Sequence, residues 1–338
     1  MRQRLISAFV ATVLLALGIV LPVSAANSAR ADTACAVPVE LVHGFGEAPR
    51  TWQEGARSML KAISQVKGVQ LAEPFDYEKH NYSWVTNENI GPALARQILS
   101  LSDANRACGG NGKIILVGHS MGVLAIRQAA SMTIDGRKVA DAIGYIVGIG
   151  GPNLGAGSAN FIGVPLASVI CGIQTPSSIF SIIRSPSAVQ KCMNGSATAA
   201  MAWNSPQLRA LPPFPDGVPV HQLAGLVSAF GSFSIGPPGD EVVSVESALS
   251  GSTWMNRGDG REIFKCTFLE GSCNHWKQLN SPVFQGAVVR GIEAYLASIP
   301  SIDPTPEPAD TSPTPKSSWT PPPTSDDGTP LPSPTPSR

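Results

Sequence analysis

The feature that most constrains this 338-residue chain is the pentapeptide Gly-His-Ser-Met-Gly at residues 118–122. The run 114–117 before it is wholly apolar, which is typical of a strand covered on both faces. The run 123–131 after it has helical spacing. Glycine on either side of the serine lets neighbouring backbone pass close to it in a tight strand-to-helix turn. We therefore expect an α/β chain in which such a turn presents Ser120 as a nucleophile.

Apolar runs continue to alternate along the chain. Strand-like runs occupy residues 37–42, 142–149 and 218–223, and helix-like runs occupy residues 51–63, 89–104 and 284–298. Strands that alternate with helices predict a mostly parallel central sheet with helices on both faces. Residues 155–215 are rich in Gly, Ser, Pro and Ala and have no clear period. A stretch of that length predicts a lid-like insertion over a site.

The two ends of the chain differ from its middle. Arg2 and Arg4 precede an apolar run that ends in small residues, which is the layout of a secretory signal peptide. We expect this signal peptide over residues 1–31; the alternative is an uncleaved membrane anchor, for which the run is slightly short. Residues 303–338 are dominated by Pro, Ser and Thr and predict a disordered tail. One folded domain is therefore expected over residues 32–302, in a secreted or cell-envelope-associated protein.

All six cysteines lie in the expected mature region. An even number of cysteines in an exported chain predicts disulfides. Pairing between neighbours in the sequence gives Cys35–Cys108, Cys171–Cys192 and Cys266–Cys273. Metal ligation is the alternative, but no Cys-x-x-Cys or His/Cys spacing favours it. We expect neither a metal nor a cofactor.

Charge is sparse and balanced in this sequence. Lys and Arg number 24, Asp and Glu number 24, and charged residues make up 14% of the chain, against roughly 25% in an average globular protein. No basic stripe is available to neutralise phosphates, which excludes nucleic acid as an expected partner. We expect a monomer whose partner is its substrate.

The motifs of the chain resemble those of the α/β-hydrolases, and more narrowly of secreted bacterial triacylglycerol lipases and esterases of the actinobacterial type. The resemblance is carried by residues 118–122, by Val-His-Gly-Phe-Gly at residues 42–46, and by Gly-Gly-Pro-Asn-Leu-Gly at residues 150–155. It extends over about residues 37–298. Lipases often have Thr-Pro-His-x-Gly at the third motif, so Asn153 departs from their pattern.

The resemblance implies a Ser-Asp-His triad and an α/β-hydrolase fold. A serine hydroxyl needs a base, and only His221 and His275 follow Ser120 in the sequence. His221 lies inside an apolar strand, where a packed, hydrogen-bonded histidine is expected. His275 lies in a loop before the last helix and is the predicted base. The predicted acid is Asp240, because Asp-Glu-Val-Val resembles the Asp-Gly-Val-Val of bacterial lipases. Three other acidic residues remain alternatives: Glu241, Glu246 and Asp259.

Two backbone N–H groups are expected to stabilise the oxyanion. One belongs to the residue after the nucleophile, Met121. In the lipases that this chain resembles, the other follows His-Gly of an early loop, which is Phe45 here. His43 is expected to pack beneath this loop, and His119 to support the nucleophile turn.

The implied activity is hydrolysis of lipid or small acyl esters through an acyl-enzyme, with transient contact to a lipid interface. Apolar residues between 155 and 235 are expected to line an acyl pocket or to pack in the core, and the Cys171–Cys192 loop is expected to form a lid. Two alternatives remain open. One is an envelope-associated acyltransferase that uses the same triad, and the other is a non-catalytic binding protein of the same fold.

Overall fold

The computed structural model describes residues 35–55, 58–156, 171, 186–228, 238–253, 260–267 and 270–299. The expected signal peptide and C-terminal tail lie outside these residues, as does most of the Cys171–Cys192 loop, so the predictions made for them stay predictions. Within the described ranges, no helix is both long enough and apolar enough to cross a bilayer.

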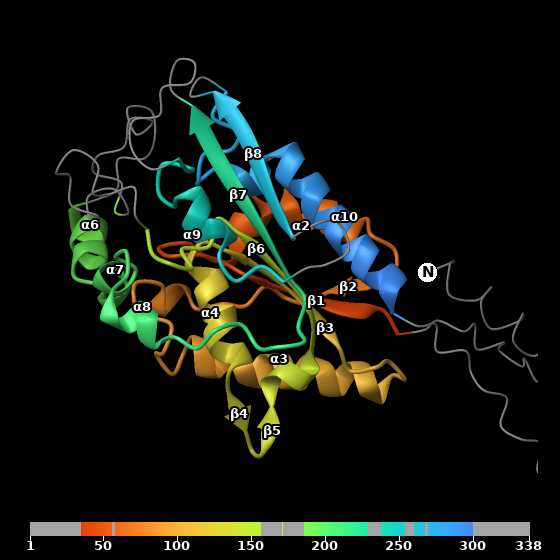
Figure 1. Ribbon diagram of the computed structural model, residues 1–338. Coiled ribbons are helices and arrows are strands. Elements are labelled where there is room, and N and C mark those ends of the chain that lie inside the picture. The colour runs from red at the N-terminus through yellow and green to blue at the C-terminus, as the bar shows by residue number, and fades with distance from the viewer. Residues whose placement is uncertain are drawn as a thin grey trace, which may run out of the picture. The chain divides into compact units, whose positions relative to one another are not determined.

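A six-stranded parallel sheet forms the centre of the described chain, in the order β2-β1-β3-β6-β7-β8 (Figure 1). Its strands are β1 (Val37–Val42), β2 (Val69–Leu71), β3 (Ile114–His119), β6 (Ile143–Ile149), β7 (Val220–Ser228) and β8 (Arg261–Thr267). A separate antiparallel pair consists of β4 (Thr133–Ile134) and β5 (Arg137–Lys138). The predicted mostly parallel central sheet is confirmed.

Helices connect these strands. They are α2 (Met59–Ser64), α3 (Gly91–Ala107), α4 (Met121–Ala130), α6 (Pro186–Met193), α7 (Ser196–Ala200), α8 (Pro206–Ala210), α9 (Val245–Leu249) and α10 (Pro282–Ser298). Short 3-10 turns are η1 (Pro49–Gln53), η2 (Glu78–His80), η3 (Val139–Ala142) and η6 (Gln278–Asn280).

The alternation of side chains along each strand produces two cores. In β3, Ile114 and Leu116 pack in the cluster that contains side chains of α3 and α4. Ile115 and Val117 point to the opposite face and pack in the cluster that contains side chains of α2 and α10. Because successive residues of a strand face opposite sides of a sheet, an all-apolar strand requires cover on both. The helices lie accordingly on both faces (Figure 1).

The order of the strands reverses its direction across the sheet between β1 and β3, which makes this position a topological switch point. After β1 the chain moves outward to β2, and it then returns to form β3 on the other side of β1. In open parallel sheets, ligands bind beyond the carboxyl ends of the strands at such a point. A ligand site is therefore expected at the loops that follow β1 and β3.

One predicted helix, residues 51–63, is wrong as a single element. The structure has η1 first and then α2, and Gly55 between them has φ +84°. That left-handed conformation stops a helix, and Ser58 then caps α2 by accepting a hydrogen bond from the backbone N–H of Lys61 at 3.2 Å.

The described cysteines form three disulfides, Cys35–Cys108, Cys171–Cys192 and Cys266–Cys273. These fit the expectation of a disulfide-bonded chain and are typical of extracellular proteins.

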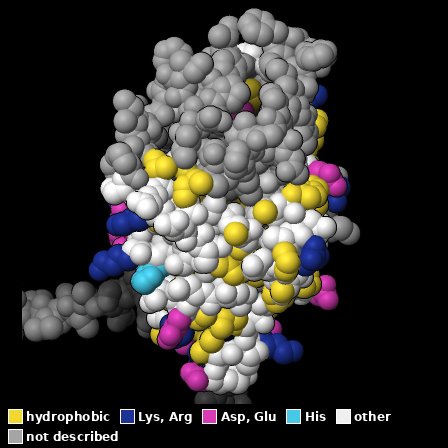
Figure 2. Space-filling view, turned by 90° about the vertical axis from the view of Figure 1, so that its left-hand side faces the viewer, with side chains coloured by type: hydrophobic (Ala, Val, Ile, Leu, Met, Phe, Trp, Pro, Cys, Tyr) yellow, Lys and Arg dark blue, Asp and Glu magenta, His cyan; other side chains and the backbone are white. Residues whose placement is uncertain are grey.

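On the face that carries α6 to α8, acidic and basic side chains are interspersed and hydrophobic side chains occur in small groups (Figure 2).

Candidate active site

Ser120 lies on the turn between β3 and α4 and has a strained backbone, with φ 53° and ψ −127°. Few residues other than glycine adopt positive φ, and those that do occur often at functional sites. The flanking glycines make the turn sterically feasible. A Cβ on Gly122 would lie 2.1 Å from the carbonyl oxygen of Val42, and one on Gly118 would lie 2.8 Å from Cδ1 of Ile126. Close packing around the serine thus requires glycine at both positions.

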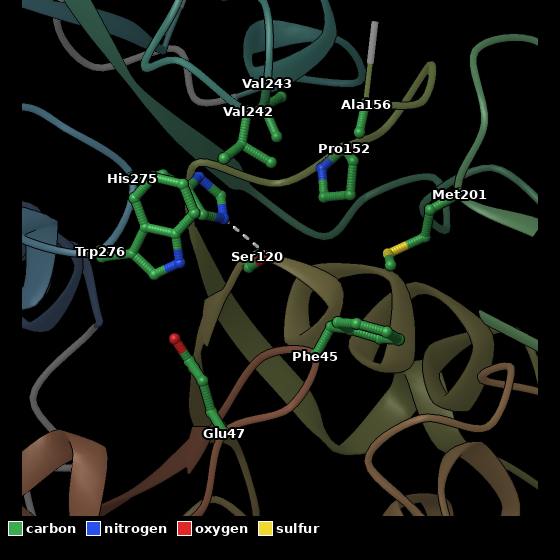
Figure 3. A pocket seen from close by; sticks show the side chains of 10 residues that line it. All are labelled: Phe45, Glu47, Ser120, Pro152, Ala156, Met201, Val242, Val243, His275 and Trp276. Carbon is green, nitrogen blue, oxygen red and sulfur yellow. Dashed lines mark hydrogen bonds between the residues drawn. The ribbon is translucent and has the colours of Figure 1, made fainter. Parts of the chain in front are cut away.

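Three side chains from distant parts of the sequence form one chain of hydrogen bonds. His275 Nε2 lies 2.9 Å from Ser120 Oγ (Figure 3), and His275 Nδ1 lies 2.8 Å from Asp240 Oδ2. All three residues are buried. An imidazole that donates its Nδ1–H to the carboxylate presents Nε2 to accept the serine proton. The structure therefore brings together the three residues that the sequence predicted.

Both oxygens of the Asp240 carboxylate accept hydrogen bonds. Oδ1 accepts the backbone N–H groups of Val242 at 3.1 Å and Val243 at 2.7 Å. Oδ2 accepts Nε2 of the fully buried Gln278 at 2.7 Å, in addition to His275. These donors fix the carboxylate against the imidazole. Sequence reasoning missed Gln278, because no motif surrounds it.

The other acidic candidates lie elsewhere. Glu241 has φ +79°, the left-handed conformation that favours glycine. Its position is the one at which the lipases that this chain resembles have glycine. The Glu241 carboxylate accepts a hydrogen bond from Nδ2 of Asn274 at 2.5 Å. Glu246 lies in α9, and Asp259 lies outside the described residues.

The two predicted oxyanion residues flank the serine. Met121 is the first residue of α4, so its N–H is one of those that a helix leaves without an intrahelical partner. Phe45 follows β1 and lines the same pocket as Ser120. The intervening Gly44 approaches the nucleophile so closely that a Cβ on it would lie 2.8 Å from the Cβ of Ser120. Both residues are therefore positioned at the switch point between β1 and β3.

The pocket over Ser120 is mainly apolar (Figure 3). Its lining residues are Phe45, Glu47, Ser120, Pro152, Ala156, Met201, Val242, Val243, His275 and Trp276. Apolar residues expected to line it, at 161–180 and 230–233, lie outside the described residues. The pocket walls that are described suit a hydrocarbon group more than a charged one.

Two histidines have the structural roles that the sequence predicted. His43 is fully buried, stacks on Tyr77 with ring centroids 3.9 Å apart, and places Nδ1 3.1 Å from the carbonyl oxygen of Gly44. Burial lowers the pKa of His43, so this ring stays neutral. His221 is buried in β7, where Tyr145 Oη and a carboxylate oxygen of Glu262 contact its two nitrogens at 2.9 and 3.0 Å.

Glu47 is a residue of the pocket that sequence reasoning missed. Its carboxylate lies 3.0 Å from Nδ1 of the buried His119. Burial alone would lower the pKa of His119, but the charge of Glu47 and hydrogen bonds to Glu47 and to the His275 carbonyl raise it above its ordinary value. Burial opposes ionisation of Glu47 as well, yet His119 and the Gly44 N–H lower the pKa of Glu47 to about 2. The two side chains are therefore an ion pair.

Comparison with known proteins gives distant likenesses. Neither a protein-family model nor a curated protein matches the chain. Among solved structures it is similar to the mature Bacillus licheniformis lipase BlEst2, with a TM-score of 0.46 and 15% identity over 75% of this chain and 92% of that one. It is similar also to Aspergillus fumigatus lipase B, with a TM-score of 0.45 and 13% identity over 75% of this chain and 52% of that one. A third is the esterase RhEst1 from Rhodococcus sp. ECU1013, with a TM-score of 0.39 and 16% identity over 78% of this chain and 92% of that one.

Proposed function

We propose that this chain is a serine ester hydrolase, a lipase or esterase that acts on acyl esters. The observation that carries the proposal is the unbroken hydrogen-bond chain from Ser120 through His275 to Asp240. It lies beyond the carboxyl ends of a parallel sheet and opens into a mainly apolar pocket. This geometry is what activation of a serine hydroxyl requires.

The first half of the reaction acylates the serine. Ser120 Oγ attacks the ester carbonyl carbon while His275 Nε2 takes the hydroxyl proton. The carbonyl oxygen becomes an oxyanion, which accepts hydrogen bonds from the N–H groups of Phe45 and Met121. The bond between the carbonyl carbon and the alcohol oxygen then breaks, and His275 gives its proton to the departing alcohol. The acyl group remains bonded to Ser120.

The second half returns the free enzyme. Water loses a proton to His275 Nε2 and attacks the acyl carbon, and the same two N–H groups stabilise the second oxyanion. When the bond to Ser120 Oγ breaks, His275 returns the proton to that oxygen and a carboxylic acid leaves. Throughout, Asp240 orients the imidazole and stabilises its protonated form without taking the proton itself.

The substrate class follows from the pocket walls and from the export signals in the sequence. Apolar side chains such as Val242, Met201 and Phe45 surround Ser120 and favour an apolar acyl or alcohol group. The signal-peptide pattern and the disulfides support action outside the cytoplasm, at or beyond the cell envelope. Lipid or small esters are the proposed substrates, met transiently at a lipid interface.

The test is hydrolysis of p-nitrophenyl butyrate and p-nitrophenyl palmitate by the purified, disulfide-bonded protein, beside Ser120→Ala. We expect turnover of at least one ester and a loss of about 10⁴-fold or more in the variant. The ratio of the two rates separates a lipase from a short-chain esterase. A folded wild-type protein without turnover on either ester would contradict hydrolysis, and acyl transfer to an added alcohol would then identify an acyltransferase.

A further inference from the structure

A second His–carboxylate pair lies beside the proposed triad. Glu47 stands in the loop after β1, and His119 is the last residue of β3, directly before the nucleophile. The Glu47 carboxylate is 3.0 Å from His119 Nδ1. The His119 and His275 rings lie 5.0 Å apart between centroids. No step of the proposed reaction uses either side chain.

Glu47 fixes the loop that carries the predicted oxyanion residue Phe45. Its Oε2 accepts the backbone N–H of Gly44 at 2.6 Å. Its own carbonyl oxygen accepts Nδ2 of Asn81 at 2.7 Å, and the carbonyl oxygen of Asn81 accepts the N–H of Gly46 at 3.1 Å. The residues on both sides of Phe45 are thus tied to one carboxylate and one asparagine.

His119 extends the same network to the proposed base. Its Nε2 lies 3.1 Å from the backbone carbonyl oxygen of His275, and its Nδ1 faces the Glu47 carboxylate. A carbonyl and an ionised carboxylate only accept hydrogen bonds, so both ring nitrogens must carry a proton to satisfy them. His119 is 1% exposed, and a buried imidazolium persists only with such compensation.

We propose that Glu47 and His119 form a positioning pair for the reaction, which holds the loop 44–47, the nucleophile turn and the loop of His275 in their reactive arrangement. This inference rests on the proposed ester hydrolysis. The positioning pair has a second consequence, because Glu47 also lines the pocket in which the oxyanion forms. His119 neutralises a carboxylate that would otherwise oppose the negative charge of the transition state.

The substitutions Glu47→Gln and His119→Asn are expected to lower kcat by different amounts. Without Glu47, His119 loses the charge that keeps it protonated, and a neutral ring remains. Without His119, the Glu47 carboxylate keeps the N–H of Gly44 but loses its charged partner, beside the reacting carbonyl. We therefore expect kcat to fall about tenfold in Glu47→Gln and about 100-fold in His119→Asn, with KM changed less than about threefold, since misplaced or unpaired groups at a reacting centre act on the transition state.

The double variant Glu47→Gln/His119→Asn supplies the rescue. It removes the unpaired carboxylate, so its kcat should exceed that of His119→Asn, whereas independent losses would multiply. His119→Gln separates the two contacts further, because its longer side chain can reach the His275 carbonyl but carries no charge for Glu47. A lower kcat in the double variant than in His119→Asn would overturn the positioning pair.

A matched control exists elsewhere in the sheet, two strands away from β3. Glu262 lies 3.0 Å from Nε2 of the buried His221, at the beginnings of β7 and β8 and away from Ser120. Glu262→Gln therefore breaks a contact of the same kind without touching the site. We expect its kcat to stay within about twofold of wild type. An equal loss of kcat in Glu262→Gln would show a general loss of stability instead.

Hydrogen exchange separates this inference from the proposed function. The Gly44 amide, which donates to Glu47, should exchange at least about tenfold faster in Glu47→Gln and in His119→Asn, but not in Glu262→Gln. This measurement needs no turnover, so it decides the role of the pair even if the wild-type protein hydrolyses no ester. Unchanged exchange at Gly44 together with kcat within twofold of wild type would overturn the positioning pair.

Discussion

At the scale of single residues, the surroundings of Asp240 favour an ionised carboxylate, because every group that contacts its oxygens is a hydrogen-bond donor. Four donors surround its two oxygens, among them His275 Nδ1 and Gln278 Nε2. In Asp240→Asn the amide nitrogen would face one of these donors, so the imidazole would lose its orienting partner. We expect kcat to fall about 10⁴-fold with little change in the melting temperature. Steady-state kinetics with thermal unfolding checks this, and a kcat above a tenth of the wild-type value would argue that another residue is the acid.

Glu40 in β1 provides a second prediction, about stability and pH. The residue is fully buried and accepts a hydrogen bond from Gln97 Nε2 at 2.6 Å. Burial raises the pKa of Glu40 from its ordinary value of 4.5 to about 7. The folded state thus holds this proton more tightly than the unfolded state, so its contribution to stability is lost as pH rises from about 4.5 to about 7.

Glu40→Gln removes that pH dependence. We expect the unfolding free energy of the variant, relative to wild type, to increase between pH 5 and pH 8 by on the order of 1–3 kcal/mol. Urea denaturation at both pH values measures it. Parallel pH profiles for wild type and Glu40→Gln would refute the assignment.

Residues carried by local motifs could be predicted from the sequence, and residues that act through contacts across the fold could not. Ser120 could be predicted because the glycines that its tight turn requires form a recognisable Gly-x-Ser-x-Gly motif. His275 could be separated from His221 because one lies in a loop and the other in an apolar strand. Glu47 and Gln278 have no such pattern, since their partners belong to other elements and approach only when the sheet has formed.

At the scale of elements, strands buried on both faces could be predicted and edge strands could not. β3 and β6 are buried at every residue and consist mainly of apolar residues and glycine, a pattern typical of strands covered on both faces. β8 mixes charged and apolar residues without strict alternation at the edge of the sheet, with one buried residue among seven. Such a segment resembles an exposed loop as much as a strand. The register of β8 is supplied by its pairing with β7 and not by its own composition.

The contact between α4 and β1 allows a prediction at this scale. Gly122 is the second residue of α4, and a Cβ on it would meet the Val42 carbonyl oxygen at 2.1 Å. We expect Gly122→Ala to lower the unfolding free energy by about 1–3 kcal/mol and to reduce kcat, because the helix must move away from β1 and carry the nucleophile turn with it.

Gly286 provides the matched comparison. It lies inside α10, where a Cβ would meet only the flexible end of Arg290, at 3.3 Å. Gly286→Ala should therefore stabilise the protein by about 0.5–1 kcal/mol through helix propensity alone, with unchanged kcat. Urea denaturation and the ester assay test both variants. Equal stability changes in the two would show that the approach of α4 to β1 is not sterically limited.

At the scale of the whole molecule, two of the disulfides are expected to differ in how much they contribute to stability and to activity. Cys35–Cys108 joins residues 73 apart and ties the beginning of β1 to the end of α3, whereas the proposed nucleophile lies beyond the carboxyl end of β3. Cys266–Cys273 joins residues 7 apart and ties the end of β8 to the loop of His275. Loop-closure entropy makes the longer loop worth more, about 4 kcal/mol against about 2.5 kcal/mol.

The paired serine variants should therefore separate the two effects. Cys35→Ser/Cys108→Ser is expected to lose more unfolding free energy but to keep the wild-type kcat while folded, because the bond itself lies near the amino ends of β1 and β3, away from the triad. Cys266→Ser/Cys273→Ser should lose less stability and yet lower kcat about tenfold, since the disulfide and the hydrogen bond from the Cys273 N–H to Cys266 Sγ hold the loop that carries His275. Denaturation and kinetics on both variants test this. If kcat followed stability in the same order, the loop of His275 would owe its position to the sheet and not to its disulfide.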